Sequence, residues 1–352
     1  MRLKAASYQI VEGQYLRDIL DQPPALERTL RGLRIAEDLK RFAVRLRESK
    51  LRRIVLTGMG ASMHALYPLF LQLNEHGYTA IAAETSELVH SLQCFFDPET
   101  LIVAVSQSGQ SAEIVRLLEE NRGHAPIVGV TNTAGSPLAS QANVSIVTEA
   151  GTEFSVSCKT YVTALMALHL LGGFFCGCEP SQTREELAQT IPAAHSYLRG
   201  WRDHIFQMAA ELKAMRNFFL LGRGTSLAAA GDGSLILKES VRLHAEGMSG
   251  AAFRHGPLEM VNEETFAVVF AGPESTRPLQ RRLLADIRKA GGRTACIAED
   301  DTPGPWNLPR TPTAVQHILE IMPVQMMTLA LAAEAGIEAG RFARIPKITA
   351  TE

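Results

Sequence analysis

One short turn holds the residues best suited to chemistry in this chain. Ser106-Gln107-Ser108-Gly109-Gln110-Ser111 follows the apolar run 101–105 and precedes a segment with helical spacing. Serine hydroxyls and free backbone amides at the start of a helix form a cradle that binds phosphate without lysine or metal. A serine-rich turn can also be a plain helix cap, so the motif alone leaves both interpretations open.

A second turn, Gly58-Met59-Gly60-Ala61-Ser62, follows the apolar run Ile54–Thr57. Two glycines after a strand are typical of a dinucleotide site, and Glu84 could imitate the acidic residue that binds a ribose hydroxyl. The third glycine of that fingerprint is missing, so the pattern is weak evidence for a nucleotide. The alternative is that the glycines only permit a tight turn from strand to helix.

The turn at 58–62 has a counterpart later in the chain, which indicates a duplicated domain. Phe218–Ser226 repeats the apolar run and the Gly-x-Gly-x-Ser pattern of Ile54–Ser62 at an offset of 226 − 62 = 164 residues. The same or a slightly larger offset pairs three further apolar runs with predicted strands in the second half. These pairs are Leu101–Val105 with Thr265–Val269, Ile127–Val130 with Thr294–Ile297, and Val144–Thr148 with Val315–Leu319.

Short apolar runs alternate with helix-length segments, such as Glu113–Asn121 and Leu279–Ala290, in both halves. This alternation predicts an α/β fold in which each half is a parallel sheet flanked by helices and joined by right-handed crossovers. We expect four segments along the chain. They are a helical segment at 1–48, a first domain at 49–182, a helical linker at 183–216 and a second domain at 217–352.

The repeat also separates the two halves by their expected roles. Where the first half has Ser106–Ser111, the second has Phe270-Ala271-Gly272-Pro273-Glu274-Ser275, which loses most of the serines. Ligands of open parallel sheets bind at the carboxyl ends of the strands, where both turns fall. We therefore expect the first half to be the one specialised for phosphate binding.

Composition limits the partners. The net charge of −2 gives no basic field for nucleic acid or an anionic membrane. The five cysteines are an odd number, and Cys176-Gly177-Cys178 is too tight for a zinc knuckle, so we expect buried thiols and neither metal nor cofactor. Residues 160–178 carry no charge, but Thr163 and His169 favour a buried helix over a membrane span. The start of the chain lacks a signal-peptide pattern, which predicts a cytoplasmic protein.

An ordered set of motifs resembles the tandem sugar isomerase (SIS) domains of the isomerase half of glucosamine-6-phosphate synthases. The resemblance covers nearly the whole chain, including Glu12 and residues 22–26 at its start. The motifs are Gly58–Ser62, Ser106–Ser111, Glu149–Glu153, Leu237-Lys238-Glu239, His244-Ala245-Glu246, Arg254–Leu258 and Pro346–Glu352.

The resemblance implies two flavodoxin-like SIS subdomains in tandem, which agrees with the repeat. Family members bind sugar 6-phosphates at a dimer interface, so the resemblance implies a homodimer with a shared active site. The implied partner is a small sugar phosphate, not a nucleic acid or a membrane. The implied substrate-binding residues are Gly60, Ala61, Ser62, Ser106, Gln107, Ser108, Ser111, Val156 and Ser157.

Three further positions match catalytic residues of the family. Glu239 matches the carboxylate that moves a proton between C1 and C2, which a base with a pKa raised by burial can do. His255 matches the histidine that opens the sugar ring and that the family takes from the neighbouring subunit. Lys347 matches the tail lysine that polarises the carbonyl or forms a Schiff base with it. Without the family, Glu239 could be a surface partner of Lys238, and His255 could simply end a helix.

The sequence departs from the family pattern at several places. The synthases carry a glutaminase domain with an N-terminal nucleophilic cysteine, whereas Met1 is followed by Arg2 here, so we expect no glutamine hydrolysis by this chain. Met59, Ile236 and Ala252 differ from the usual residues, and the stretch 153–160 is one residue shorter. These changes concern the sugar end of the site more than its phosphate end.

Two function classes therefore remain beside the weak dinucleotide interpretation. The first is an enzyme that isomerises a sugar phosphate, or that deaminates or aminates an amino-sugar phosphate of the glucosamine 6-phosphate and fructose 6-phosphate type. The second is a non-catalytic regulator that binds a sugar phosphate on the same fold. Glu239, His255 and Lys347 favour the enzyme, because a regulator has no need to keep them.

Overall fold

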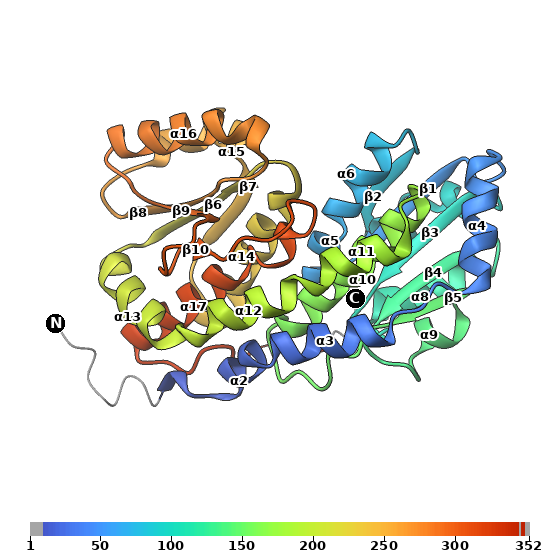
Figure 1. The fold of residues 1–352 in the computed structure, drawn as a ribbon, viewed down its shortest axis with the longest axis horizontal. Coiled ribbons are helices and arrows are strands. Elements are labelled where there is room, and N and C mark those ends of the chain that lie inside the picture. Colours follow the sequence, from blue (N-terminus) through green and yellow to red (C-terminus); the bar gives the residue numbers. More distant parts are fainter. Residues whose placement is uncertain (1–9, 345, 349–352) are drawn as a thin grey trace. The chain divides into compact units, whose positions relative to one another are not determined.

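The computed structural model of the chain describes residues 10–344 and 346–348. The chain forms two compact units, and neither is a single stretch of sequence. The described part of the N-terminal unit comprises 24–152, 159–188 and 346–348. That of the C-terminal unit comprises 10–23, 153–158 and 189–344. Each unit is built around its own parallel sheet (Figure 1).

The sheet of the N-terminal unit has five parallel strands in the order β2-β1-β3-β4-β5. The central strands are apolar and fully buried, as expected for a sheet covered on both faces. The strands are β1 (Arg53–Gly58), β2 (Ala80–Glu84), β3 (Thr100–Val105), β4 (Ile127–Thr131) and β5 (Val144–Val147).

Helices cover both faces of this sheet. The helices α5 (Ala61–Ala65), α6 (Tyr67–Glu75) and α10 (Lys159–Phe175) contact one another on one face. On the other face, α7 (Thr85–His90), α8 (Ala112–Asn121) and α9 (Pro137–Gln141) pack in a row. Apolar side chains of α7 and α8 form a core with those of β1 and β3. The helices α3 (Gln22–Gly32), α4 (Glu37–Arg47) and α11 (Pro180–Ala188) complete this part of the chain.

The sheet of the C-terminal unit repeats the same topology. Its five parallel strands follow the order β7-β6-β8-β9-β10, which corresponds strand for strand to β2-β1-β3-β4-β5. This is the flavodoxin-like order, and its occurrence in both units confirms the predicted duplicated α/β fold. The strands are β6 (Asn217–Gly222), β7 (Ala245–Ser249), β8 (Thr265–Phe270), β9 (Arg293–Glu299) and β10 (Asn307–Leu308).

This second sheet is also covered on both faces (Figure 1). The helices α14 (Leu227–Val241), α13 (Trp201–Leu212) and α17 (Met322–Ala335) pack together on one side. On the other side, α15 (Gly250–Arg254) and α16 (Arg277–Lys289) pack through a core that includes Phe219 and Phe253. The helices α2 (Gln14–Leu20) and α12 (Thr190–Arg199) belong to the same unit.

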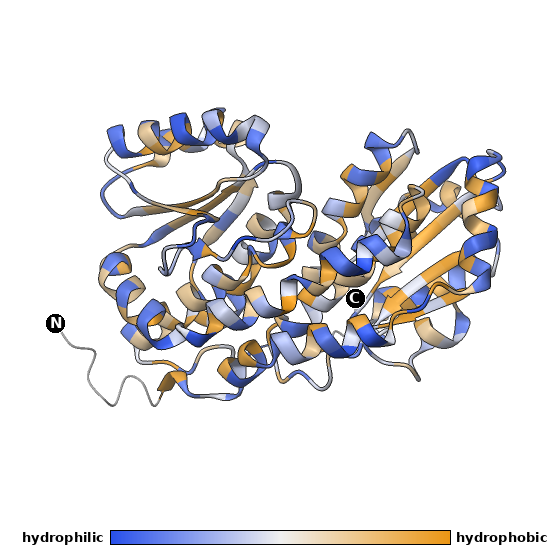
Figure 2. Cartoon of the chain, viewed as in Figure 1, coloured by the Kyte–Doolittle hydropathy of each residue, from blue (hydrophilic) through white to orange (hydrophobic). Residues whose placement is uncertain are grey.

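The hydropathy of the elements follows this layering. Figure 2 shows apolar strands inside each sheet and helices with one polar and one apolar side, as in α16. The predicted uncharged segment at 160–178 forms α10, in which nearly every residue is buried. The segment Gln316–Ala335 is long and apolar enough to cross a membrane, but 89% of it is buried within the protein. Burial of this extent is typical of a core helix.

The strands predicted from the repeat are confirmed except for one. Thr265–Val269 lies in β8 and Thr294–Ile297 lies in β9. The prediction that Val315–Leu319 forms a strand equivalent to β5 is wrong. This segment forms a buried 3-10 turn that leads into α17. The place beside β9 is taken by the two-residue strand β10. A short continuous apolar run fits a buried helical segment as well as a strand, because it has no periodicity to separate them.

Candidate functional site

The candidate phosphate site lies at the carboxyl ends of β1 and β3, which pair side by side. Gly58, the last residue of β1, pairs with Val105, the last residue of β3. A Cβ atom added to Gly58 would lie 3.0 Å from the Val105 carbonyl oxygen and 3.1 Å from the Ser62 Cβ. A side chain at position 58 would therefore push apart the two turns that the sequence pointed to. The structure brings these two turns together in the N-terminal unit.

Backbone hydrogen bonds hold the serine turn onto the next strand. The Gln107 carbonyl accepts bonds from the Asn132 N–H (3.0 Å) and from the Thr131 hydroxyl (3.2 Å). The Ser106 N–H donates to the Val130 carbonyl at 3.0 Å. These bonds tie the start of the turn to β4 and to the residue that follows β4.

The hydroxyls of the turn are partly used by the turn itself. The Ser106 Oγ accepts a bond from the Gly109 N–H at 3.1 Å, and the Ser108 Oγ accepts one from the Gln110 N–H at 3.3 Å. Each of these serine side chains is 8% exposed. A hydroxyl that accepts a bond still has its own proton to donate, which suits it to an anionic acceptor.

Gly109 gives the turn its sharp bend. Its φ of +63° lies in the left-handed region that favours glycine. An added Cβ would lie 2.7 Å from the Ser136 Cβ and 2.8 Å from the Thr131 Oγ1, so no side chain fits. The Leu138 N–H donates to the Gly109 carbonyl at 3.0 Å and holds this residue against α9.

Ser111 is the N-terminal cap residue of α8, but its side chain makes no capping hydrogen bond. α8 has ten residues, and the amides of its first turn lack partners within the helix. These amides and the positive end of the helix dipole favour an anion at this point. The half-buried Ser111 hydroxyl lies beside them, so the cap supplies donors that the helix does not consume.

The remaining turn residues of the predicted site are Gly60, Ala61 and Ser62. Gly60 has a φ of +53° and precedes α5, and its counterpart Gly224 has a φ of +56°. The duplicated halves thus keep the same backbone conformation at the same step of the repeat. Ala61 and Ser62 are half-buried at the start of α5.

The other predicted site residues are divided between the two units. Val156 and Ser157 lie in the short segment Glu153–Cys158 of the C-terminal unit, where Val156 is buried. Glu239 and His255 belong to the same unit, and Lys347 belongs to the N-terminal unit. The structure thus assigns each residue to a unit, and their roles toward one ligand stay a prediction.

Glu239 lies near the end of α14 and is half-buried, whereas the neighbouring Lys238 is exposed. The buried side of α14 carries one further acid, which the sequence analysis did not single out. Asp232 is fully buried, and neither of its carboxylate oxygens has a hydrogen-bond partner among the residues that the structure describes. Burial, followed by the charges of Glu239 and Glu153, raises the pKa of Asp232 well above its usual value. The sequence signal was its spacing of seven residues from Glu239, which puts both on one helix face.

His255 ends the short helix α15, and its backbone N–H donates to the Ala252 carbonyl at 3.0 Å. Its side chain is exposed, and the next residue, Gly256, has a φ of +135°. Arg254 forms an ion pair with Asp286 on α16 and so anchors this corner. The histidine ring is therefore presented at the surface of the C-terminal unit.

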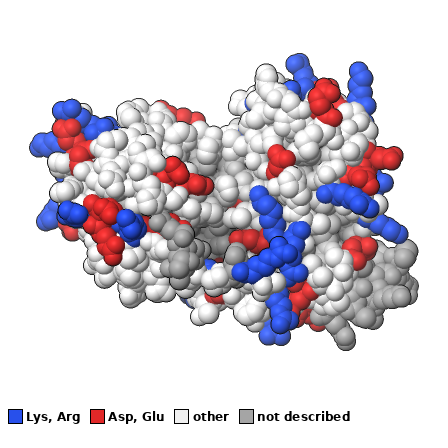
Figure 3. Space-filling view, turned by 180° about the vertical axis from the view of Figure 1, so that it is seen from behind, with Lys and Arg blue, Asp and Glu red and all other residues white. Residues whose placement is uncertain are grey.

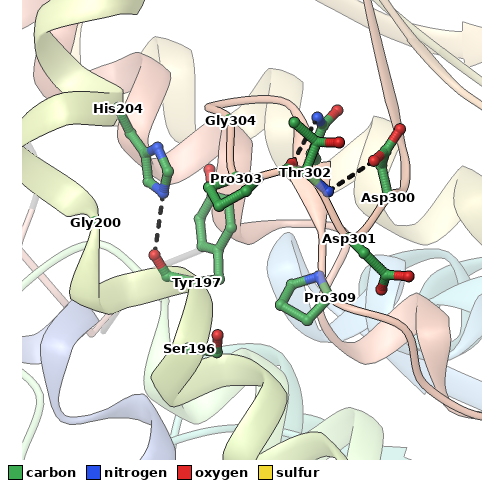
Figure 4. Close-up of a pocket in the computed structure, with 11 residues that line it drawn as sticks. Ser196, Tyr197, Gly200, His204, Asp300, Asp301, Thr302, Pro303, Gly304 and Pro309 are labelled. Carbon is green, nitrogen blue, oxygen red and sulfur yellow. Dashed lines mark hydrogen bonds between the residues drawn. The ribbon is translucent and has the colours of Figure 1, made fainter.

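A cavity of about 260 Å³ lies in the C-terminal unit between α12, α13 and the loop 300–309 (Figure 4). The rings of Tyr197 and His204 stack there at 4.6 Å, and the His204 Nε2 donates to the Tyr197 carbonyl at 3.0 Å. Asp300 and Asp301 also line it, and the lining residues include no lysine or arginine. This cavity is therefore a poor place for a phosphate.

Charges of both signs are interspersed on the face of the molecule in Figure 3. Among the described residues, several charges form local pairs, such as Arg53 with Asp97 at 3.0 Å and Arg216 with Glu264 at 3.2 Å. No broad field of one sign guides a ligand on this face.

Comparison with protein families agrees with this architecture. The model of the SIS domain matches twice, at residues 46–172 and 211–335. A glutamine–fructose-6-phosphate aminotransferase (isomerizing) from Pyrococcus horikoshii is 30% identical over 96% of this chain. The chain spans 57% of the length of that relative.

Solved structures show the same fold. A candidate phosphosugar isomerase from Silicibacter pomeroyi is 28% identical, with a TM-score of 0.77 over 92% of this chain and 99% of that one. A glucosamine-6-phosphate deaminase from Thermotoga maritima has a TM-score of 0.76 over 96% of this chain and 100% of that one. At 18% identity, the second likeness concerns the fold alone.

Proposed function

Because this chain belongs to the SIS domain family, we propose that it binds a sugar 6-phosphate and moves a carbonyl or imine between C1 and C2. The substrate is of the fructose 6-phosphate and glucosamine 6-phosphate type, and the reaction is isomerisation, deamination or its reverse. The observation that carries the proposal is the serine turn 106–111. It is rigid, bends at Gly109 and leads into free helix amides.

The turn holds the phosphate, in this proposal, through donors that carry no charge. The hydroxyls of Ser106, Ser108 and Ser111 and the first amides of α8 surround one point at the end of β3. The turn 60–62 closes the other side, and Gln107, Val156 and Ser157 contact the sugar. Hydrogen bonds to an ionised phosphate are about twice as strong as neutral ones, so several of them hold a sugar phosphate firmly.

Proton transfer falls to Glu239. Its carboxylate takes the proton from C2 of the open-chain aldose, and the electron pair moves onto O1 to give an enediolate. The same carboxyl then returns the proton to C1 while the O2 hydroxyl proton passes to O1, which leaves the ketose. His255, from the second subunit of a homodimer, moves the proton from the O1 hydroxyl to the ring oxygen and so opens the ring.

Lys347 acts at the carbonyl. Its ammonium group polarises the oxygen, or its amine forms a Schiff base with the ketose carbonyl and releases water. With an amino sugar, the same proton shift gives a 2-imine. Water adds to this imine, and ammonia leaves to yield fructose 6-phosphate. The reverse direction uses free ammonia.

The test is to follow glucosamine 6-phosphate, and fructose 6-phosphate with ammonium, by detecting ammonia and hexose phosphates. We expect turnover by the native protein and a loss of at least about a thousandfold in Glu239→Gln, because that variant cannot carry the proton. Phosphosugar affinity should change little in that variant. Lys238→Gln, on the exposed side of the same helix, is the matched control and should keep full turnover.

Turnover that survives in Glu239→Gln would show that another group moves the proton. If the native protein binds these phosphosugars but converts none of a panel of related phosphates, the protein is a sugar-phosphate-binding regulator instead. If the native protein neither binds nor converts these phosphosugars, the proposal of a phosphosugar site is wrong.

A further inference from the structure

The second sheet has counterparts of both turns of the first: residues 222–226 correspond to the turn 58–62, and residues 270–275 correspond to the serine turn. In the repeat, Arg223 directly follows β6 where Met59 follows β1, since 223 − 164 = 59. Its side chain is half-buried, and its Nε is fully buried without a hydrogen-bond partner. Within residues 10–344 and 346–348, Arg223 forms no ion pair.

A second arginine with the same properties starts the helix that follows β8. Arg277 is the first residue of α16, which is 13 residues long. Its Nε is likewise buried and unpartnered, and its side chain is half-buried. The described residues offer Arg277 no carboxylate partner either. Two half-buried guanidinium groups thus lack a counter-charge at the carboxyl end of one sheet.

The turns that bear these arginines lie against each other, as the surroundings of Gly250 and Gly272 show. A Cβ atom placed on Gly250, the first residue of α15, would lie 3.0 Å from the Gln280 Oε1 and 3.8 Å from the Arg223 Nε. One on Gly272 would lie 3.5 Å from the Arg223 carbonyl oxygen and 3.4 Å from the Thr276 Oγ1. Gln280 follows Arg277 by three residues, so both lie on one face of α16. The Arg223 side chain therefore runs along the face of α16 that Arg277 begins.

Gln280 has the geometry of a positioning residue. It is 2% exposed, and its Nε2 donates to the Phe270 carbonyl at 2.8 Å, which fixes the orientation of the amide. Its Oε1 is buried, has no donor and lies beside the same glycine as the Arg223 Nε. The two atoms lie near each other without a hydrogen bond among the described residues, so the Gln280 oxygen puts an acceptor on the same side of the turn as the unpartnered Arg223 Nε–H.

Nearby acids do not neutralise the pair. Asp286 is occupied by Arg254, and the Glu320 Oε1 accepts a bond from the Ser226 hydroxyl at 2.8 Å. The pKa of Glu320 is raised by burial, and no arginine is among the groups that act on it. Glu274 is exposed in the turn before α16. The positive end of the α16 dipole adds to the two arginine charges.

We propose that Arg223 and Arg277 form a second anion site, which binds a phosphate-bearing metabolite at the carboxyl end of β6 and β8. The guanidinium fork fits the oxygens of a phosphate or a carboxylate, and two forks at a helix start favour a dianion. The choice of a phosphate monoester rests on the proposed function, which places the same dianion at the serine turn of the other half. The second site is separate from the serine turn and from the catalytic residues, and would sense a second ligand.

The test is calorimetric titration of the full chain with inorganic phosphate. We expect one phosphate fewer per chain in the double variant Arg223→Gln/Arg277→Gln, or a Kd weaker by about tenfold or more for that site. Arg282→Gln removes an exposed charge of the same helix and is the matched control, in which both sites remain. KM for a phosphosugar substrate should be unchanged in the double variant.

Equal phosphate binding by the native chain and the double variant would overturn the proposal, as would equal weakening by Arg282→Gln. If the double variant does not fold, the single variants Arg223→Lys and Arg277→Lys test the anion site instead. Each keeps the positive charge but lacks the forked guanidinium group that binds two oxygens of one anion. Each should weaken phosphate binding, and unchanged binding in both contradicts the site. Methyl phosphate and malonate can be compared as competitors of inorganic phosphate at this site. Stronger competition by methyl phosphate supports a phosphate ester as the ligand, and stronger competition by malonate overturns that choice.

Discussion

At the scale of single residues, the buried acid Glu320 makes the stability of the fold depend on pH. It is 2% exposed between the 3-10 turn Gln316–Ile318 and α17. Burial raises its pKa to about 7, the Ser226 hydroxyl opposes this shift, and Glu299 adds a smaller rise. The folded protein therefore holds this proton more tightly than the unfolded chain does.

The sign of the pH effect follows from that difference. A raised acid pKa contributes stability that is complete below the ordinary value of 4.5 and is lost as the pH rises through about 7. The shift corresponds to roughly 3 kcal/mol. We expect Glu320→Gln to reduce the loss of unfolding free energy between pH 5 and pH 8 by about 2 kcal/mol. Urea unfolding of the native chain and of the variant at pH 5 and at pH 8 measures this difference in unfolding free energy.

Glu263→Gln is the matched control, because Glu263 is exposed. Its pH profile should follow that of the native chain. An unchanged profile in Glu320→Gln would mean that the carboxylate is accommodated in the fold at high pH, for example by rearrangement around Ser226.

At the scale of elements, the serine turn depends on one backbone conformation. Gly109→Ala places a Cβ at a φ of +63° and against Ser136 and Thr131. We expect a loss of about 2–4 kcal/mol in unfolding free energy and weaker phosphosugar binding. Gly135→Ala, whose added Cβ meets nothing within 4 Å, is the control from the neighbouring loop and should change neither. Urea unfolding and titration with glucosamine 6-phosphate distinguish the two variants.

The elements also show how far sequence reasoning reaches. Apolar runs bounded by glycine turns predicted β1, β3, β6, β8 and β9, because buried parallel strands read as continuous apolar stretches. β7 (Ala245–Ser249) was missed, since an edge strand that is mostly half-buried carries no such run. Val315–Leu319 was mistaken for a strand because its burial is that of a core element of either type.

The residues of the candidate site also differ in how far the sequence predicts them. The serine turn was predictable because its donors are consecutive in the sequence. Asp232 carries only the weak signal of its spacing from Glu239, and the pair Arg223 and Arg277 carries none, because what marks all three is burial without a partner among the described residues. A buried polar atom without a partner is a property of packing, and no spacing in the sequence reports it.

At the scale of the whole molecule, the two halves of the duplicated sequence are not two independent pieces of chain. The C-terminal unit includes residues 10–23, which lie far from it in sequence. The Gln22 Nε2 donates to the Gln325 Oε1 at 2.8 Å, and the Asp18 Oδ2 accepts a bond from the Phe154 N–H at 2.8 Å. A Cβ on Gly340 would lie 2.9 Å from the Tyr15 ring. The N-terminal segment is thus part of the core of the C-terminal unit.

This interleaving predicts the behaviour of fragments. Tyr15, Leu16 and Ile19 are at most 4% exposed, and burying such side chains contributes about 1.5–3 kcal/mol each. Their loss, together with the buried Gln22–Gln325 pair, approaches the total stability of about 5–15 kcal/mol of a typical domain. We expect residues 189–344 alone to show no cooperative thermal transition by circular dichroism.

Joining residues 10–23 to Gln189 through a flexible linker should restore such a transition, because it returns these side chains to the same core. The matched control is the same fusion with Tyr15, Leu16 and Ile19 changed to serine, which should stay uncooperative. If residues 189–344 melt cooperatively without residues 10–23, the second half is an autonomous domain. Residues 10–23 would then pack on its surface without being needed for folding. The observed packing instead makes residues 10–23 a structural part of the second half.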